Sequence, residues 1–344
     1  MSQYILLRNI EVENANAIHG ITYGFPSPIS FLGYTHAVSR YLQQRFDSKT
    51  TLGGVGIICH EHQVHTQRIG YDTIFSLSRN PITKDGKTAP FNEEGRMHFT
   101  VSLLIKCNFD VLDLELGEGA PEQREKQFCN VLRQQAEKQR LAGGTITRIG
   151  MIKVLNFDPS TDEGEREFKR WMLRLIPGFV LKDRHDALAQ HHQQHLTKDA
   201  ESHLLDSWLD FIALDSEAVL PEGFEGDAVE GETTASWQIK PKPELGYFIP
   251  LSIGFESISE LYEPSKVLNA RDNSIPLQFV ESAYSVGQWV GPHRIKTPEE
   301  LLWNYHYEEN EHGKAFYICR SQSALTTNAS ALNDEADSLY DDEY

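Results

Sequence analysis

The sequence predicts an α+β fold, with a ferredoxin-like domain at the N-terminus and a mixed helical and β-rich region after it. Residues 1–150 show the patterns of strand, helix, strand, hairpin, strand, helix and strand, which is the split βαβ order of ferredoxin-like domains. One of these strands alternates apolar and polar side chains throughout residues 96–103. After residue 237, short apolar runs are separated by Pro and Gly, which is typical of β-rich segments.

The first strand and the first helix are predicted within residues 4–46. The strand over 4–13 begins with an apolar run and then alternates, so we expect its start to be buried and its end half exposed. Ser27 is a helix N-cap and Pro28 suits the first helical position, which predicts a helix over 28–46. His36 lies about 140° from Phe31 at ~100° per residue, off the core face. The stripe on that core face comprises Phe31, Thr35, Val38, Leu42 and Phe46.

A second strand is predicted over 55–64, and a hairpin follows it. Residues 71–95 form a segment that is long for a loop, so we expect it to be structured or functional. Residues 84–87, Lys-Asp-Gly-Lys, are a strong turn signal and predict that the hairpin protrudes. Its basic side chains either contact phosphate groups or only keep a solvated hairpin soluble: Arg68, Arg79, Lys84 and Lys87.

The third strand, over 97–106, has the most regular pattern in the chain. Met97, Phe99, Val101 and Leu103 form its apolar face, and Arg96, His98, Thr100 and Ser102 form its polar face. The third strand of a ferredoxin-like sheet is central, so we expect the polar set to lie on the open face, where RNA-recognition sheets bind their ligand. The alternative is a sheet face that is only solvated. This strand lacks an aromatic pair, which argues against generic base stacking there. A helix over 121–140, ended by Gly143-Gly144, and a strand over 145–149 complete the domain.

Beyond residue 150 the sequence predicts a helical region, an acidic linker, a β-rich region and a tail. A helix over 165–176 has a basic side formed by Arg166, Lys169, Arg170 and Arg174, with Glu165 paired to Lys169, and two further helices are predicted over 184–196 and 200–214. Residues 237–325 are the β-rich region, in which a capping box at 297–300 predicts a final helix holding Leu301, Leu302 and Trp303. Asn269-Ala270-Arg271-Asp272 is a turn; Arg271 suits either a phosphate or base edge or a salt bridge with an acid.

The charge of the chain is concentrated in two acidic segments. The formal net charge is -18, but residues 215–236 and 326–344 together hold thirteen acids and no Lys or Arg. Without them, 37 acids face 32 bases. The body of the protein is therefore close to neutral and compatible with a local basic groove. The tail over 326–344 has few large apolar residues and is expected to be disordered.

Catalytic and cofactor motifs are mostly absent from the sequence. There is no phosphate-binding Gly-Lys-Ser/Thr loop, dinucleotide fingerprint or Gly-x-Ser-x-Gly elbow, and the four cysteines are scattered. His191 and His195 are one helical turn apart, but the Gln-rich surroundings favour a solvated helix, so we predict no metal site and no cofactor. No apolar run reaches the ~20 residues of a membrane span, and the N-terminus lacks signal-peptide features, so we expect a cytoplasmic protein.

Ordered blocks along the chain resemble a known family. Together they resemble the Cas-five-type subunit of the type I-F CRISPR surveillance complex, the Csy complex of the Cascade type. The resemblance implies a ferredoxin-like RNA-recognition fold with a thumb-like insertion, a role in holding the 5′ handle of the guide RNA, and pairing with the large subunit. The blocks are residues 14–40, GVGIICH (54–60), LSRNP (77–81), EEGRMHFTVSLL (93–104), RLAGGTI (140–146), LIPGF (175–179), NARD (269–272), PLQFVE (276–281) and PHRI (292–295).

On this resemblance we predict a non-catalytic structural subunit that binds guide RNA and takes part in DNA target recognition through the complex. Its expected partners are the guide RNA, the large subunit, the repeated backbone subunit and, through the complex, target DNA, with no membrane. The basic residues of the 165–176 helix are expected to face nucleic acid or a partner. The residues expected to contact RNA are Asn14, Asn16, Arg79, Arg96, His98, Asn269 and Arg271.

Two other functions are compatible with the sequence. Relatives in the wider family cut precursor guide RNA without a metal, and His36, near Tyr23 and Tyr34 in sequence, is the candidate general base for such an endoribonuclease. A protein-interaction adaptor without RNA contact would fit the acidic charge.

Overall fold

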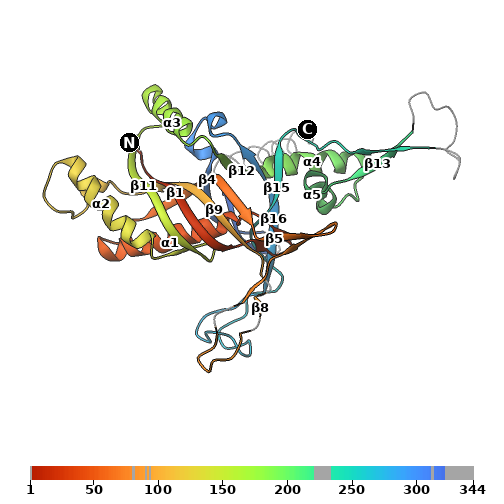
Figure 1. Cartoon of the computed structure of the whole chain (residues 1–344), viewed down its shortest axis with the longest axis horizontal. Helices are drawn as coiled ribbons and strands as arrows, with labels where there is room; N and C mark the ends of the chain where they lie inside the picture. The colour runs from red at the N-terminus through yellow and green to blue at the C-terminus, as the bar shows by residue number, and fades with distance from the viewer. Residues whose placement is uncertain are drawn as a thin grey trace, which may run out of the picture.

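The protein has a mixed α+β fold. The computed structural model describes residues 2–79, 82–89, 91–92, 94–220, 234–310 and 314–321. Ten strands form one antiparallel sheet at the centre of the molecule (Figure 1). In spatial order the strands are β10 (Arg140–Leu141), β11 (Gly144–Phe157), β1 (Ser2–Asn16), β9 (Arg96–Cys107), β4 (Leu52–Val64), β12 (Phe179–Asp183), β16 (Val280–Val290), β15 (Tyr247–Ser257), β18 (Ala315–Ser321) and β17 (Leu302–Glu309).

The N-terminal strands have the predicted chain order. Helix α1 (Pro28–Arg45) lies between β1 and β4 in sequence, and α2 (Pro121–Ala136) lies between β9 and β11. Ser27 caps α1, because its hydroxyl accepts a hydrogen bond from the Ile29 N–H at 3.3 Å, and Pro28 is the first helical residue. The predicted strands over 4–13, 55–64 and 97–106 fall within β1, β4 and β9, so these elements are confirmed.

The sheet has a core on each face at one end, because alternate residues of β1 point to opposite sides. Ile5 and Leu7 pack with the helices α1 and α2, whereas Tyr4 and Leu6 pack with α3 (Asp162–Arg174). The start of β1 is therefore buried on both faces, as predicted. The face opposite α1 is open only in part, which corrects the expectation for Ser102: this residue is fully buried, and its hydroxyl lies 2.7 Å from His60 Nε2.

The C-terminal strands follow a closed path that begins and ends on β4. One edge of β4 pairs with β12 through Cys59 and Ile58, and the same strand pairs with β17 through Gly56 and Val55. Gly56 leaves room for the buried Leu301 side chain beside this pairing, because a Cβ at this position would lie 1.7 Å from Leu301 Cδ1. Strands from both halves of the sequence therefore share one sheet.

The predicted final helix is wrong. Residues Pro298–Glu300 form a short 3-10 turn, η3, the Thr297 side chain makes no capping bond, and β17 begins at Leu302. Trp303 is completely buried, and its indole N–H donates to the Leu181 carbonyl at 2.9 Å. Burial of this apolar segment and its pairing with β4 outweigh the local capping signal.

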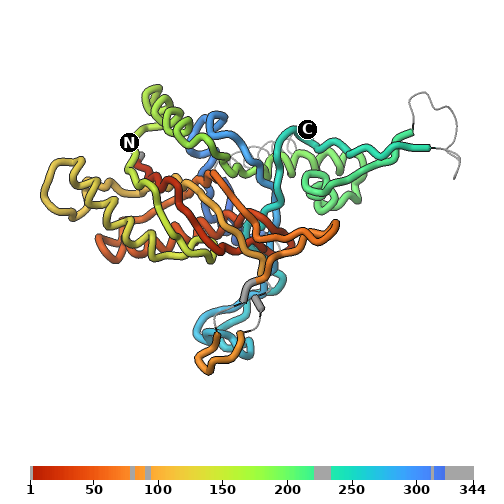
Figure 2. Tube along the Cα trace, viewed as in Figure 1, coloured from red at the N-terminus to blue at the C-terminus, as the bar shows by residue number. Residues whose placement is uncertain are grey.

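Smaller elements project from the sheet. Between β4 and β9 the chain forms two short antiparallel pairs, β5 (Thr66–Ile69) with β6 (Asp72–Phe75) and β7 (Ser78–Arg79) with β8 (Phe91–Asn92). In Figure 2 the later, light orange part of this excursion, which contains β8, and the blue loop between β15 and β16 both reach below the sheet, whereas the β5–β6 hairpin extends to the side. The remaining elements are β2 (Ile18–His19), β3 (Thr22–Tyr23), η1 (Val111–Asp113), α4 (His185–Lys198), α5 (Leu204–Ile212), β13 (Ser216–Val219), β14 (Ser236–Ile239) and η2 (Pro292–Arg294).

The two acidic segments lie largely outside the described residues. The ends of the predicted linker pair with each other, because β13 and β14 form a two-stranded hairpin. Residues 221–233 and the predicted tail over 326–344 are outside the described residues, so the predicted disorder of the tail stays a prediction. No helix in the described part of the chain is long and apolar enough to cross a membrane.

Candidate nucleic-acid interface

Four of the predicted RNA-contacting residues meet at one corner of the sheet, where β1 ends and β9 begins. Asn16 and Arg96 are cross-strand partners, and the Asn14 N–H donates to His98 Nδ1 at 3.2 Å. The side chain of Asn16 is occupied within the protein, since its amide group bonds both the N–H and the carbonyl of Ile18, at 3.1 and 2.9 Å. Asn16 thus fixes the chain at the start of the β2–β3 hairpin.

A groove opens at this corner on the side of α1. It has a volume of about 670 Å³, and its α1 wall presents only small or partly covered side chains at Ser30, Gly33 and Ala37. Such a wall allows a ligand backbone to approach closely. The groove is lined by Asn16, His19, Ser30, Gly33, Tyr34, Ala37, Glu94, Arg96, Arg140, Ala142 and Gly143.

Two arginines give the groove its positive charge. Arg96 forms an ion pair with Glu94 at 2.8 Å, its side chain is 19% exposed, and it also donates to the Asn14 carbonyl at 3.4 Å. Arg140 is exposed and donates to the Gly143 carbonyl at 3.2 Å; no carboxylate in the described part of the chain lies within 4.0 Å of it. Arg140 is therefore the more available cation for an anionic ligand.

His19 positions the start of α1 beside the groove. Its Nε2 accepts a hydrogen bond from the Ser27 N–H at 3.3 Å, which requires that nitrogen to be unprotonated. Burial is the main cause that lowers the pKa of His19 from its ordinary value near 6.5, with a smaller opposing effect from a backbone hydrogen bond of Asn16. His19 is therefore a neutral acceptor at neutral pH rather than a third cation.

A glycine-containing hairpin closes the groove, which corrects the predicted end of the second helix. Helix α2 ends at Ala136, and residues 140–145 form the β10–β11 hairpin with Ala142 and Gly143 in its turn at φ 50° and 75°. Two consecutive residues at positive φ are typical of tight hairpin turns. A Cβ on Gly144 would lie 2.7 Å from the Glu13 carbonyl oxygen, so this glycine allows the close approach of β1.

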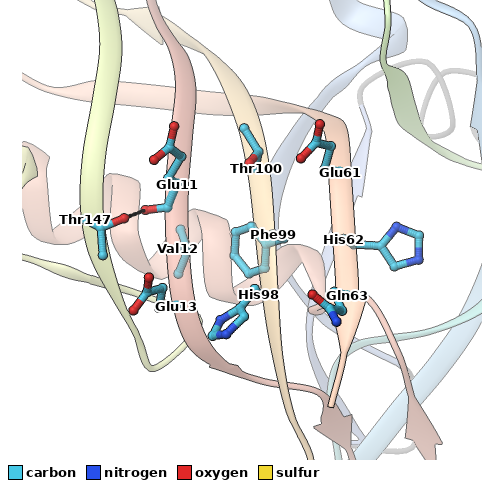
Figure 3. A pocket seen from close by; sticks show the side chains of 10 residues that line it. All are labelled: Glu11, Val12, Glu13, Glu61, His62, Gln63, His98, Phe99, Thr100 and Thr147. Carbon is cyan, nitrogen blue, oxygen red and sulfur yellow. Dashed lines mark hydrogen bonds between the residues drawn. The ribbon is translucent and has the colours of Figure 1, made fainter. Parts of the chain in front are cut away.

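The opposite face of the same strands is acidic (Figure 3). Glu11, Thr100 and Glu61 are cross-strand neighbours in one row, and Glu13 lies beside them. Glu11 pairs with Arg148 at 3.3 Å, but Glu13 and Glu61 have no ion pair among the described residues. His98 lines this face, so its predicted RNA contact stays a prediction and has carboxylates around it that repel phosphate.

Comparison with known proteins identifies the family. A family model described as "CRISPR-associated protein (Cas_Csy2)" matches residues 5–319. The chain belongs to the Csy2 family of CRISPR-associated proteins. It is similar to "CRISPR-associated protein Csy2" of Pseudomonas aeruginosa (strain UCBPP-PA14), with 35% identity over 319 residues that cover 90% of this chain and 93% of the relative. The resemblance to the Csy family that the ordered blocks indicate is confirmed.

In this Csy2-family chain the basic side of α3 lies on the sheet face opposite α1. Its predicted residues Arg166, Lys169, Arg170 and Arg174 are all exposed. None of the four, nor Glu165, forms an ion pair within the described part of the chain, so the predicted Glu165–Lys169 pair does not form. The Arg174 guanidinium instead stacks on the Trp171 ring at 4.6 Å.

The remaining predicted residues are on projecting segments. Arg271 is exposed on the β15–β16 loop and has no ion pair among the described residues. Asp272, its neighbour, accepts hydrogen bonds from the Ser274 N–H at 2.8 Å and hydroxyl at 2.6 Å, which lower the pKa of that carboxyl. Asn269 adopts φ 60° in the same loop. Arg79 lies in β7, and its side chain is outside the described residues.

His36, the candidate general base, is exposed on α1, as its position off the apolar stripe predicts. No hydrogen bond in the described part of the chain connects it to Tyr34 or Tyr23. Tyr34 is buried, its hydroxyl donates to the Ala136 carbonyl at 3.3 Å, and burial raises its pKa. Tyr34 is therefore unsuited to proton transfer with a ligand.

Arg140 and His19 are polar residues of the groove that the sequence analysis does not predict as site residues. Arg140 opens the block RLAGGTI, which the sequence predicts as the end of a helix, and the hairpin that places Arg140 in the same groove as Arg96 depends on pairing with β11. The Ala-Gly-Gly run at 142–144 is a turn signal for this hairpin. No local signal marks His19, because its role depends on contact with Ser27.

Proposed function

We propose that the chain is a non-catalytic structural subunit of a type I-F CRISPR RNA-guided surveillance complex that binds the 5′ handle of the guide RNA. Membership of the Csy2 family supports a place in the complex. The groove beside α1 supports binding of the 5′ handle. The observation that carries the proposal is that Arg96 and Arg140 line the same groove as the small residues of α1. Charged donors beside an open wall suit a single-stranded sugar-phosphate backbone.

The two arginines would have different roles in this groove. Arg140 makes only a hydrogen bond to a carbonyl in its own hairpin, so it is available to contact phosphate. Arg96 is held by Glu94 and by the Asn14 carbonyl, which fixes its direction and reduces its net attraction for phosphate. Asn14 and Asn16 would act as positioning residues that hold the backbone at this corner.

The fold supports a ferredoxin-like RNA-binding module. The strand order β11-β1-β9-β4, with α1 and α2 as the crossovers, fits the split βαβ arrangement. The excursion between β4 and β9 is located where the resemblance implies a thumb. We propose on this basis that the chain is a Cas-five-type subunit whose excursion, with Arg79, contacts RNA or the repeated backbone subunit.

Partner contacts are proposed for the surfaces outside the groove. The unpaired cations of α3 would face target DNA or the large subunit, because they are exposed on the side of the sheet away from the groove. Asn269 and Arg271 would reach a phosphate or base of the handle from the β15–β16 loop. A cytoplasmic location follows from this function.

The test is purification of the reconstituted assembly. The chain is co-expressed with the other complex subunits and a guide RNA, and the purified particle is imaged by cryo-electron microscopy. We expect the chain in the particle, with the 5′ handle in the groove between α1 and the β10–β11 hairpin. A particle in which the chain contacts only protein would support the adaptor function, and a chain that purifies without RNA or partner would contradict both.

We propose that the chain does not cut RNA. Purified protein in the presence of a chelator should leave labelled precursor guide RNA intact, because His36 has no described partner for proton transfer. Cleavage that is lost in His36→Ala, and kept in the matched surface variant His203→Ala, would establish the endoribonuclease alternative instead.

A further inference from the structure

Helices α4 and α5 lie on the opposite side of the molecule from α2 (Figure 1). A second cluster of chemically active side chains lies between these two helices. The two helices are joined by residues 199–203 and pack on each other and on β16. Their shared core consists of Ala187, Leu188, Trp208, Phe211 and Val286. This core holds the facing sides of the two helices in fixed register, so side chains at its edge have defined positions.

Two histidines of α4 converge on one carboxylate of α5. His191 Nε2 lies 2.8 Å and His195 Nε2 lies 3.3 Å from the same oxygen, Oδ2 of Asp210. The three ligand atoms all lie within 4.8 Å of one another. The side chains are partly open to solvent, with Asp210 the most exposed at 44%, so an ion can enter.

Two imidazoles and a carboxylate from two helices are a ligand set that zinc favours. We propose that His191, His195 and Asp210 bind a divalent transition-metal ion, Zn²⁺ being the best match, with water at the fourth position. Tetrahedral ligands at ~2.0–2.1 Å from zinc are roughly 3.3 Å apart. The His195–Asp210 separation already has this value, and the His191–Asp210 pair opens by about half an ångström to reach it.

An outer-shell partner orients one of the ligands. The hydroxyl of Ser207, which is completely buried, lies 3.2 Å from His195 Nδ1 and 3.1 Å from His192 Nδ1. When His195 donates its Nδ1 hydrogen to Ser207, its Nε2 presents a lone pair toward Asp210, as a metal ligand must. Ser207 then donates its own hydrogen to His192 Nδ1. Phe211 adds an edge contact with the His191 ring at 5.4 Å between centroids.

The bound ion would join α4 to α5 by coordination bonds. Sequence spacing offers only the two histidines, and a two-ligand site is weak. The helical hairpin adds Asp210, which is fifteen residues beyond His195 and therefore not visible as a local motif. Because an ion that binds only the folded state stabilises it, the ion would hold this hairpin against the sheet.

The experiment measures metal binding to the full chain, purified without a histidine tag. Chelator-treated protein is titrated with Zn²⁺ alone by calorimetry and with Co²⁺ alone by visible absorption. We expect one ion per chain, an intense d–d band for Co²⁺ in a four-coordinate site, and a higher melting temperature with Zn²⁺. His195→Ala and Asp210→Asn should each weaken binding at least ~100-fold, more than the roughly 10- to 100-fold expected when an outer-shell partner is lost.

His203→Ala is the matched control, since it removes an exposed histidine of the same region that is not in the cluster. It should leave metal affinity and the Co²⁺ spectrum unchanged. The proposal is overturned if the wild-type chain takes up no stoichiometric ion, or if His203→Ala weakens binding as much as His195→Ala and Asp210→Asn do. The first result would identify the cluster as a hydrogen-bonded contact between the helices.

Discussion

The groove beside α1 and the sheet face opposite it share strands β1 and β9, yet they have opposite charge. Arg96 and Arg140 reach the groove, whereas Glu11, Glu13 and Glu61 occupy the other face. The polar side of β9 alone does not reveal this difference. The residues that neighbouring strands place beside it decide whether a surface attracts or repels phosphate.

The largest effect is expected when the groove loses both cations. Arg96→Ala with Arg140→Ala should weaken binding of the 5′ handle by the reconstituted complex about 100-fold at moderate salt, because two charge-assisted contacts disappear. Arg140→Ala alone should also reduce the slope of log affinity against log salt by roughly 0.7. Fluorescence anisotropy with labelled guide RNA measures both quantities.

Arg148→Ala is the matched control, because it removes an arginine from the same strand as the hairpin but on the glutamate face. We expect no loss of affinity from it. If Arg148→Ala weakened binding of the handle as much as Arg140→Ala does, the two faces would not differ in the way their charges indicate.

An effect of intermediate size is expected when an uncharged side chain obstructs the groove. Ala37→Gln extends a side chain from the α1 wall into the groove without changing charge, and Gln is a good helix former. We expect about a tenfold loss of handle affinity, or ~1.4 kcal/mol, with unchanged thermal stability. Ala189→Gln on the exposed side of α4 is the control, and an equal loss in both variants would exclude a steric effect in the groove.

Acid should destabilise the groove side through His19. The pKa of His19 in the folded protein lies below its ordinary value, so the unfolded chain takes up a proton first as the pH falls below about 6.5. Its contribution to the free energy of unfolding is complete above that pH and decreases below it. Urea unfolding at pH 7.0 and 5.5 should show that His19→Gln loses less free energy of unfolding between these two pH values than wild type does. An equal loss in both proteins would mean that His19 does not contribute to the acid destabilisation.

The smallest effect is expected from deleting the acidic tail, residues 326–344. Its six acids would repel RNA only weakly at a distance, so the truncated chain should bind the handle equally well or slightly better at low salt. The difference should disappear as salt is raised. A large loss of affinity in the truncated chain would show that the tail belongs to the binding surface.

Local patterns predicted the elements of the N-terminal half well. Ser27-Pro28 marked the start of α1, and the alternation of residues 96–103 identified β9 and its buried side. These signals depend on residues close in sequence. The predicted helix at Leu301–Trp303 was wrong because the pairing of β17 with β4 is a contact between distant residues.

The candidate site was predicted only in part for the same reason. Asn14, Asn16, Arg96 and His98 meet at one corner, but Arg140 joins them only through a hairpin that the sequence suggested was a helix end. Bulges in β1 near Asn9 and Asn14, both at positive φ, also shift which residues share a face. The sequence alone therefore does not predict which charges lie side by side on neighbouring strands, or which part of the sheet α3 covers.

The most direct test is site-resolved crosslinking of the guide RNA in the assembled complex. Handle nucleotides carrying 4-thiouridine are irradiated, and the crosslinked residues of this chain are identified by mass spectrometry. We predict crosslinks to residues 30–37 of α1 and to residues 140–144 of the β10–β11 hairpin. Crosslinks to residues 61–63 of β4 on the glutamate face, with none in the groove, would contradict the account.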